Sequence, residues 1–243
     1  MKKYLLLALF IPFLGNAQLK KLVKKAKTTV STATKPNAAT GSLDIGAALK
    51  EALNNGVTKE VSKLTATDGF YKNEAVKILM PEELQKVDKT LRKMGMSNLA
   101  DEGIKSLNRA AEDAVKEATP IFVNSIKNMS ITDAKTILMG SDNAATTYLQ
   151  KSTSTALYAK FNPVVKESIG KVGADQVWSS IITQYNTLPL VSKVNPDIVD
   201  YVTNKALEGV FKMIAVEEKD IRGNLSSRTS DLLKSVFALQ DKK

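Results

Sequence analysis

The chain has 243 residues, and neither histidine nor cysteine occurs among them. These two absences exclude Ser-His-Asp and Cys-His hydrolases, haem bound through histidine and zinc sites built from Cys and His, which all need imidazole or thiolate. With 35 Lys and Arg against 25 Asp and Glu, the formal net charge is +10. Any catalysis would depend on carboxylates, Lys, Tyr or hydroxyl groups, and we predict no cofactor and no metal.

Residues 1–17 have the pattern of an export signal. Lys2 and Lys3 precede an apolar run of 11 residues, and small residues follow it, which predicts cleavage after Ala17. The run is shorter than the roughly 20 residues that cross a bilayer. An N-terminal core helix is the alternative. We therefore expect an exported protein, periplasmic or extracellular, that is soluble after signal cleavage.

Residues 18–42 are predicted to form a basic tail and a flexible linker. The mature chain would carry 33 basic and 25 acidic residues, and six of the basic ones precede Leu43, where no acid occurs. Apolar tail residues recur at helical spacing opposite lysines, a pattern that suits an anionic membrane surface or an acidic polymer. The expected contact residues are Lys20, Lys21, Lys24, Lys25 and Lys27. A solvated tail that contacts nothing is the alternative.

Residues 43–239 are predicted to form a single compact all-α domain of about 8 to 10 helices. Apolar residues recur every four positions along 45–61 and at steps of three and four along 104–114, which predicts two core helices. Further helices are expected at 81–94, 142–160, 173–186, 196–222 and 227–239. Residues 210–216 are almost all apolar, so the helix that contains them should be buried on most sides. Residues 75–80 could be extended, but one short strand makes no sheet.

Several helix ends are marked by capping residues. Thr119-Pro120, Asn162-Pro163 and Asn195-Pro196 each place an N-cap oxygen before a proline, which is favoured at the first helical position. Residues 130–133 (SITD) fit a capping box, and Gly140 is expected to end the helix that this box begins. We therefore predict helix starts at these four places.

Paired carboxylates are the one catalytic pattern that needs neither His nor Cys. Glu217 and Glu218 adjoin the apolar residues 210–216, and an apolar environment raises the pKa of a glutamate toward a value suited to a general acid. The alternative is structural, because Glu218 and Arg222 have the i, i+4 spacing of a helix ion pair and Glu217 can be exposed or paired with another helix.

Many short motifs, in order, carry a family resemblance. They include Asp68-Gly69-Phe70, Asn108-Arg109-Ala110-Ala111-Glu112, Pro120-Ile121-Phe122, the stretch from Tyr201 to Gly209, Glu217-Glu218 and the stretch from Arg228 to Leu233. From about Ile45 to Phe237, the chain resembles the bacterial family catalogued as domain of unknown function 4197. The resemblance implies an exported, helical, single-domain protein and supplies no activity or catalytic residue.

Polar residues within the matched motifs adjoin apolar core positions. A buried polar group without a partner costs about 1–3 kcal/mol, so these side chains should meet in a satisfied network between helices. The expected members are Asp68, Asn73, Asn108, Arg109, Glu112, Glu217, Arg222 and Arg228. The network either fills the core as a structural element or lines a cavity that is the ligand site.

The sequence favours a non-enzymatic binding or interaction module of the cell envelope. Its partner would be an unknown protein, an envelope component or a small ligand. Aromatic residues make up 6% of the chain and are not interleaved with Lys and Arg, so we expect no specific nucleic-acid binding. The alternative is a carboxylate-dependent glycan hydrolase or lyase that acts on the cell wall, with Glu217 or Glu218 as the acid.

Overall fold

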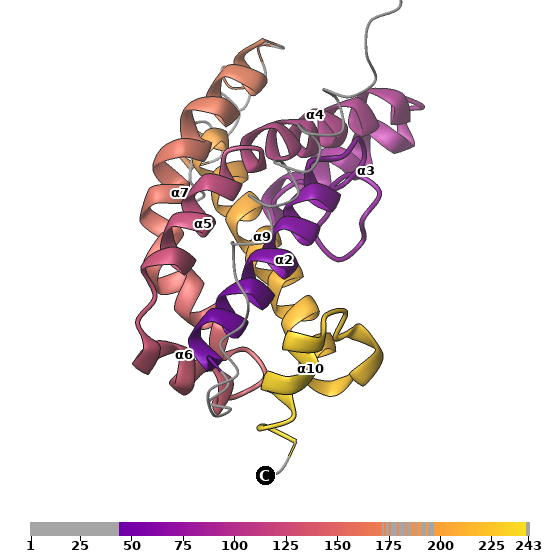
Figure 1. Ribbon diagram of the computed structural model, residues 1–243. Coiled ribbons are helices and arrows are strands. Elements are labelled where there is room, and N and C mark those ends of the chain that lie inside the picture. The colour runs from indigo at the N-terminus through magenta and orange to yellow at the C-terminus, as the bar shows by residue number, and fades with distance from the viewer. Residues whose placement is uncertain are drawn as a thin grey trace, which may run out of the picture. The chain divides into compact units, whose positions relative to one another are not determined.

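The computed structural model describes residues 44–171 and 197–241, together with single positions between 173 and 193. The chain divides into two units, Met1–Ser42 and Leu43–Lys243, and every described residue belongs to the second. Within the described residues the regular elements are all helices, without a strand, which confirms the predicted all-α class (Figure 1). The predicted export signal and basic tail, and most of the predicted helix 173–186, lie outside the described residues.

The first described helix, α2 (Ile45–Thr65), forms where the four-residue apolar repeat predicts it. Asp44 caps its N-terminus by accepting the Ala47 N–H at 3.0 Å. The helices that follow are η1 (Glu82–Leu84), α3 (Gln85–Lys93) and α4 (Ser97–Val115). The face of α4 that contains Ile104 and Leu107 is buried, as the spacing predicts.

The expected helix start at Thr119 is wrong by a few residues. Helix α5 (Ala118–Asn128) begins at the fully buried Ala118, so Pro120 is the third helical residue. The first four N–H groups of a helix have no partner within it, so a proline is tolerated there as well. Helix α6 (Ile131–Leu138) begins with the predicted capping box of Ser130 and Asp133, and Gly140 follows its end.

The expected helix start at Asn162-Pro163 is also wrong, because α7 (Ala144–Gly170) continues through Pro163. A buried residue occurs at every fourth position on both sides of the proline, and core packing therefore favours one straight helix. These residues are Leu149, Thr153, Leu157, Phe161, Val165 and Ile169. Pro163 is exposed, so the carbonyl that loses its helical N–H lies on the solvent side.

Helix α9 (Ile198–Gly223) begins later than the predicted cap at Asn195, which lies outside the described residues. The observed cap is Asp197, whose side chain accepts the N–H groups of Val199 and Asp200. The helix packs against α7, α4 and α2, so it is central to the fold as predicted. Its burial is incomplete, since Val216 is 55% exposed.

The chain ends in two short elements, η2 (Leu225–Ser227) and α10 (Asp231–Phe237), which is shorter than the predicted helix 227–239. Helix α10 packs against α2. Ser230 caps it by accepting the Leu233 N–H at 3.1 Å. None of the described helices is both long and apolar enough to cross a membrane.

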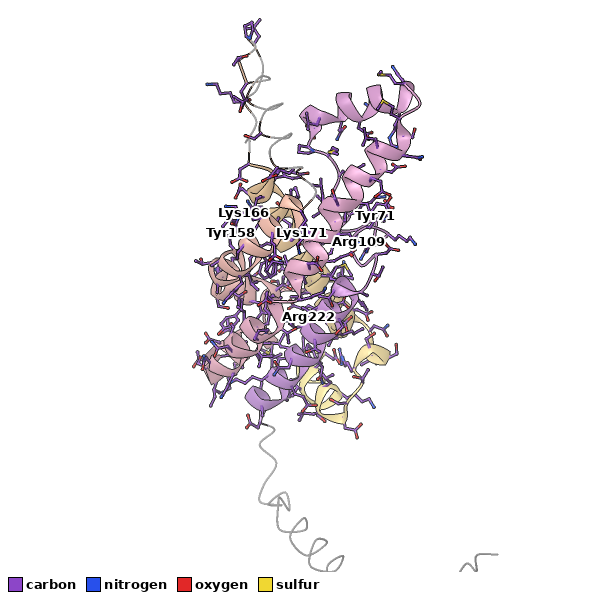
Figure 2. The ribbon with its side chains drawn as sticks, turned by 90° about the horizontal axis from the view of Figure 1, so that it is seen from above. Tyr71, Arg109, Tyr158, Lys166, Lys171 and Arg222 are labelled. Carbon is purple, nitrogen blue, oxygen red and sulfur yellow. The ribbon has the colours of Figure 1, made fainter. Side chains whose placement is uncertain are left out.

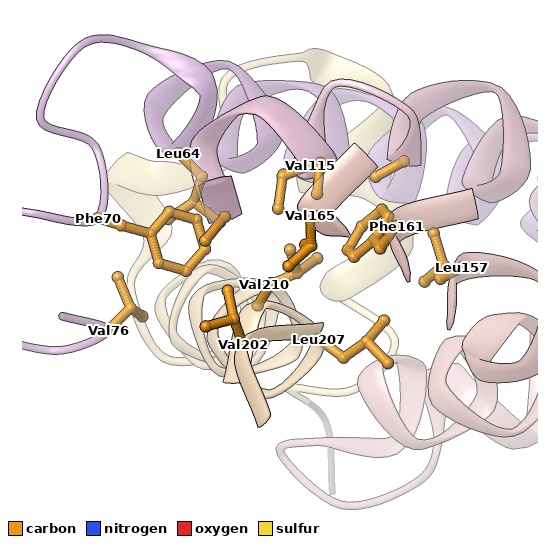
Figure 3. Close-up of a cluster of buried hydrophobic side chains, with 14 of the residues drawn as sticks. Leu64, Phe70, Val76, Val115, Leu157, Phe161, Val165, Val202, Leu207 and Val210 are labelled. Atoms are coloured by element: carbon orange, nitrogen blue, oxygen red, sulfur yellow. The ribbon is translucent and has the colours of Figure 1, made fainter. Parts of the chain in front are cut away.

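The apolar core has two parts. The larger lies among α2, α4, α5, α7 and α9 and includes Phe122. Figure 3 shows part of it, with Phe70 and Phe161 labelled. Phe122 and Phe211 meet edge to face, with ring centroids 5.9 Å apart and planes at 89°. The smaller part includes Leu49, Leu138 and Phe237 of α2, α6 and α10. Phe70 belongs to no helix, so the segment between α2 and η1 contributes to the core directly.

Candidate functional site

Asn108 of α4 holds the irregular segment that precedes η1. Its side chain is fully buried, and its Oδ1 accepts the Ile78 N–H at 2.8 Å. Its Nδ2 donates to the Ile78 carbonyl at 2.8 Å and to the Ile104 carbonyl at 2.7 Å. The amide therefore replaces the neighbouring strand that a single extended segment lacks, and all its polar atoms have partners.

Glu112, one turn later on α4, holds the start of the same segment. Its buried carboxylate accepts the backbone N–H groups of Phe70 at 3.1 Å and Tyr71 at 3.3 Å, and it pairs with Arg109. Arg109 also donates to Asp68 at 2.5 Å. These contacts bring together three predicted site residues, but they use the charges to position backbone.

The motif Asp68-Gly69-Phe70 turns the chain sharply after α2. Asp68 has φ +68°, and a Cβ on Gly69 would lie 2.4 Å from the Lys63 carbonyl oxygen, so only glycine fits at that position. The Phe70 ring packs on α9, where a Cβ on Gly209 would lie 2.7 Å from it. Hydrogen bonds from Lys72 and Arg109 hold the pKa of Asp68 below its ordinary value.

The Glu218 carboxylate of α9 caps a different helix, α7. It accepts the N–H groups of Ala145 at 2.9 Å and Thr146 at 2.8 Å, and the Thr146 hydroxyl at 2.8 Å. It also accepts two N–H groups of Arg222, at 3.0 and 2.8 Å, so the i, i+4 pair suggested by the spacing is present. Asn143, the N-cap residue of α7, makes no side-chain cap bond, and Glu218 supplies the missing acceptor.

The Arg222 guanidinium caps the C-terminus of α6. It donates to the carbonyls of Ile137 at 2.8 Å and Leu138 at 3.1 Å, and to Gln240 at 3.1 Å. Together with the two bonds to Glu218, these contacts use all five N–H groups of the guanidinium. A cation at the C-terminal end of a helix also opposes the negative end of its dipole. The pair thus joins the end of α6 to the start of α7.

Arg228 caps α9 itself. It donates to the carbonyls of Ile221 at 3.0 Å and Arg222 at 2.9 Å, and it forms an ion pair with Asp241. The guanidinium groups of Arg228 and Arg222 lie 5.4 and 5.8 Å from the centre of the Phe237 ring. The last described residues are thereby attached to the end of the central helix.

The ion pair between Arg228 and Asp241 should stabilise the fold at neutral pH and lose this contribution at acid pH. The hydrogen bond from Arg228 lowers the pKa of Asp241 below its ordinary value. A lowered pKa in the folded state stabilises the protein above the unfolded value, near pH 4, and this contribution is lost as pH falls through the folded value. Between pH 7 and pH 3, we expect the melting temperature of Asp241→Asn to fall by less than that of the unmodified protein.

Thermal unfolding at both pH values measures this difference. Asp231→Asn is the matched control, because the Asp231 side chain is 99% exposed and its ion pair with Lys234 lies on the surface. An equal loss of melting temperature in Asp241→Asn and the unmodified protein would contradict the expectation.

The two remaining predicted residues lie apart from these clusters. Asn73 accepts the Ala75 N–H at 3.1 Å and directs its amide nitrogen toward the sulfur of Met213 at 3.9 Å. Glu217 pairs with Lys59 of α2 at 2.6 Å, and this contact raises the pKa of Lys59.

The structure therefore divides the eight predicted residues between several places in the fold. Arg109 and Arg222 are labelled at separate positions in Figure 2. Sequence reasoning did not single out two further polar residues. Thr146 binds Glu218 beside Arg222, and Asp241 pairs with Arg228. Short-range spacing gives no sign of either, because their partners are 72 and 13 residues away.

A groove of about 500 Å³ lies between the segment 75–82 and α9. Its polar lining includes Lys77, Lys205, Lys212, Glu82 and Glu208. Its apolar lining includes Leu79, Met80 and the ring of Tyr201. The groove thus combines both charge signs with apolar surface, beside backbone that belongs to no helix.

The lysines of the groove differ in their partners. Lys205 pairs with Glu208 at 2.7 Å, and Lys77 lies 3.8 Å from Glu74. Lys212 donates to the Ala75 carbonyl at 2.8 Å, and no carboxylate of the described residues lies within ion-pair distance of it. Lys212 is therefore available to an anionic ligand. The described residues contain no group of three Asp or Glu side chains placed to hold a metal ion.

The sequence profile of a family described as "Protein of unknown function (DUF4197)" matches residues 39–238. The chain belongs to the DUF4197 family. The match spans α2 to α10 and contains the groove and the three arginines Arg109, Arg222 and Arg228, whereas Gln240 and Asp241 lie just beyond it. Neither the curated proteins nor the solved structures include a match to the chain.

Proposed function

We propose that this DUF4197 protein is a non-enzymatic binding module of the cell envelope and that the groove beside residues 75–82 is its binding site. The observation that carries this proposal is the contrast between the groove and the charged clusters. Glu112, Glu218 and Arg222 are buried, and each is engaged by backbone groups of neighbouring elements. The groove, in contrast, offers solvent a half-exposed Leu79 and a lysine that pairs with no carboxylate in the described part of the chain.

The same contrast favours binding over the hydrolase alternative. A general acid must reach its substrate, whereas five donors surround the Glu218 carboxylate and the residue is 7% exposed. The Glu217 carboxylate is held by the ammonium group of Lys59. Clearing of cell walls by the purified protein that disappears in Glu217→Gln or Glu218→Gln would contradict the proposal.

Photocrosslinking tests the groove as the binding site. The full chain with benzoylphenylalanine at position 79 is produced in its native cells. Irradiation should then give discrete crosslinked species in the cell envelope. The control position is Leu225, which is 68% exposed and belongs to η2, away from the groove lining. The same species from both positions, or none from position 79, would contradict the groove as the site.

The basic tail makes a separate prediction about attachment. Lys20, Lys21, Lys24, Lys25 and Lys27 should hold the mature protein on anionic membranes, at about 1 kcal/mol per lysine near the surface. We expect the mature chain to sediment with phosphatidylglycerol vesicles at low salt and to be released at high salt. A chain that lacks residues 19–27 should stay in the supernatant. Equal sedimentation of both chains would exclude this role of the tail.

A further inference from the structure

The backbone at Ile78 is extended, because Asn108 binds both its N–H and its C=O. One side chain can contact both groups only when they point to the same side, as they do in a β-strand and not in a helix. The C=O and N–H of a trans peptide point in opposite directions, and the described chain contains no cis peptide. The C=O of Lys77 and the N–H of Leu79 therefore both point away from Asn108.

These two groups face the groove, where none of the described residues bonds to them. The Tyr201 hydroxyl, which lines the groove, donates to the Leu79 carbonyl at 3.0 Å, so this edge of the segment lies on the groove side. No hydrogen bond from the described residues reaches the Lys77 carbonyl or the Leu79 N–H. One acceptor and one donor, two residues apart, are the pair that an adjacent strand residue engages with its own N–H and C=O.

We propose that the groove binds an extended peptide segment that pairs as a β-strand with the Lys77 carbonyl and the Leu79 N–H and carries an acidic side chain near Lys212. The inference rests on the proposed function, since it names the ligand of the same groove. Strand addition to an exposed edge takes its affinity from main-chain hydrogen bonds and its specificity from the alternate side chains. The ligand residue opposite Ile78 would donate its N–H to the Lys77 carbonyl and accept the Leu79 N–H, just as Asn108 donates to and accepts from Ile78 on the other side.

The lining of the groove favours an acidic partner. Lys212 is held at the Ala75 end of the free edge by one hydrogen bond, which leaves two of its three N–H groups for a carboxylate. Side chains on one face of the ligand strand would contact the apolar surface of Leu79, which is 52% exposed, together with Met80 and Tyr201. A peptide that alternates acidic and β-branched residues satisfies both features of the groove.

Calorimetric titration of the mature protein with the acetylated, amidated peptide Glu-Val-Glu-Val-Glu-Val tests the inference. We expect saturable binding that weakens with salt, and at least tenfold weaker binding of the matched peptide Lys-Val-Lys-Val-Lys-Val. Edge pairing uses the amides of alternate residues only. Of two further acidic peptides, one N-methylated at every Val and one at every Glu, one should lose binding at least tenfold while the other keeps it. Equal binding of all four peptides, or no binding of the acidic peptide, overturns the inference.

Variants of the protein test the same edge from the other side. Leu79→Pro removes the N–H that points into the groove and is compatible with an extended Ile78, whereas Leu79→Ala keeps the N–H. We expect Leu79→Pro to bind the acidic peptide at least tenfold more weakly than Leu79→Ala. Lys212→Gln should also weaken binding of the acidic peptide and reduce the salt dependence of that binding. This variant tests the inference if Leu79→Pro does not fold. Unchanged binding in the folded variants overturns the inference.

The crosslinking experiment separates this inference from the proposed function. Discrete crosslinks from position 79 together with no binding of the acidic peptide would leave the groove as the binding site and reject strand pairing. Absence of both would reject the groove itself.

Discussion

Glu218→Gln should lower the free energy of unfolding by about 3–5 kcal/mol, because it leaves the buried Arg222 without its charge partner. The amide would also bring N–H donors against the N–H groups of Ala145 and Thr146, where the carboxylate accepts. The start of α7 would lose its cap at the same time. Urea unfolding followed by circular dichroism measures the change.

The neighbouring substitution Glu217→Gln is the matched control. Lys59, the partner of Glu217, has a side chain that is 50% exposed, so loss of this ion pair should lower the free energy of unfolding by less than about 1 kcal/mol. Arg222→Met and the double variant with Glu218→Gln complete a cycle, in which the double variant should cost less than the sum of the two single changes. Equal effects of Glu217→Gln and Glu218→Gln would contradict the capping role.

Asn108→Ala should cost about 3 kcal/mol, because it removes three hydrogen bonds and leaves the buried N–H of Ile78 without an acceptor. The segment 75–80 would then keep only the Lys212 bond to the Ala75 carbonyl, the Tyr201 bond to the Leu79 carbonyl and the packing of Val76 and Ile78 among its described contacts with α9 and the core. Hydrogen exchange at the Ile78 amide should accelerate more than exchange in the middle of α4. The variant should also bind groove ligands more weakly, because the free edge is no longer held in place.

Asn204→Ala is the control for this prediction. Asn204 is exposed on α9 and donates to Asp200 of the preceding turn, its one partner among the described residues, so Asn204→Ala should change stability by about 0.5 kcal/mol or less. An Ile78 amide that exchanges at the same rate in Asn108→Ala and Asn204→Ala would show that Asn108 does not hold the segment.

Most of the fold was predictable because helices are specified by short-range patterns. The apolar repeat of α2 and the Ser130 capping box each lie within a few residues of sequence, and both appear as predicted. The errors occur where long-range packing opposes a local signal. Pro163 signals a helix start, but the buried residues on both sides of it favour one continuous helix. Thr119 signals a helix cap, but Ala118 before it is buried in the core and already belongs to α5.

The candidate site was less predictable because its contacts join distant parts of the chain. The motif containing Asn108 and Glu112 pointed to buried polar side chains, but nothing in it identifies residues 70–78 as the backbone they bind. Glu218 and Arg222 were predictable as a pair from their spacing, whereas their use as caps for α7 and α6 depends on tertiary contact. The groove appears only when the segment 75–82 is placed beside α9.

The caps supplied by α9 also affect the order in which parts of the chain can fold during synthesis. The ends of α6 and α7 meet their capping groups on Glu218 and Arg222 only after some 70 to 85 further residues have been added. A nascent chain that stops before residue 218 therefore carries a corner with free N–H and carbonyl groups. Ribosome-bound fragments of increasing length should remain open to protease at residues 138–146 until the last part of α9 emerges, and this corner should be among the last to become protected.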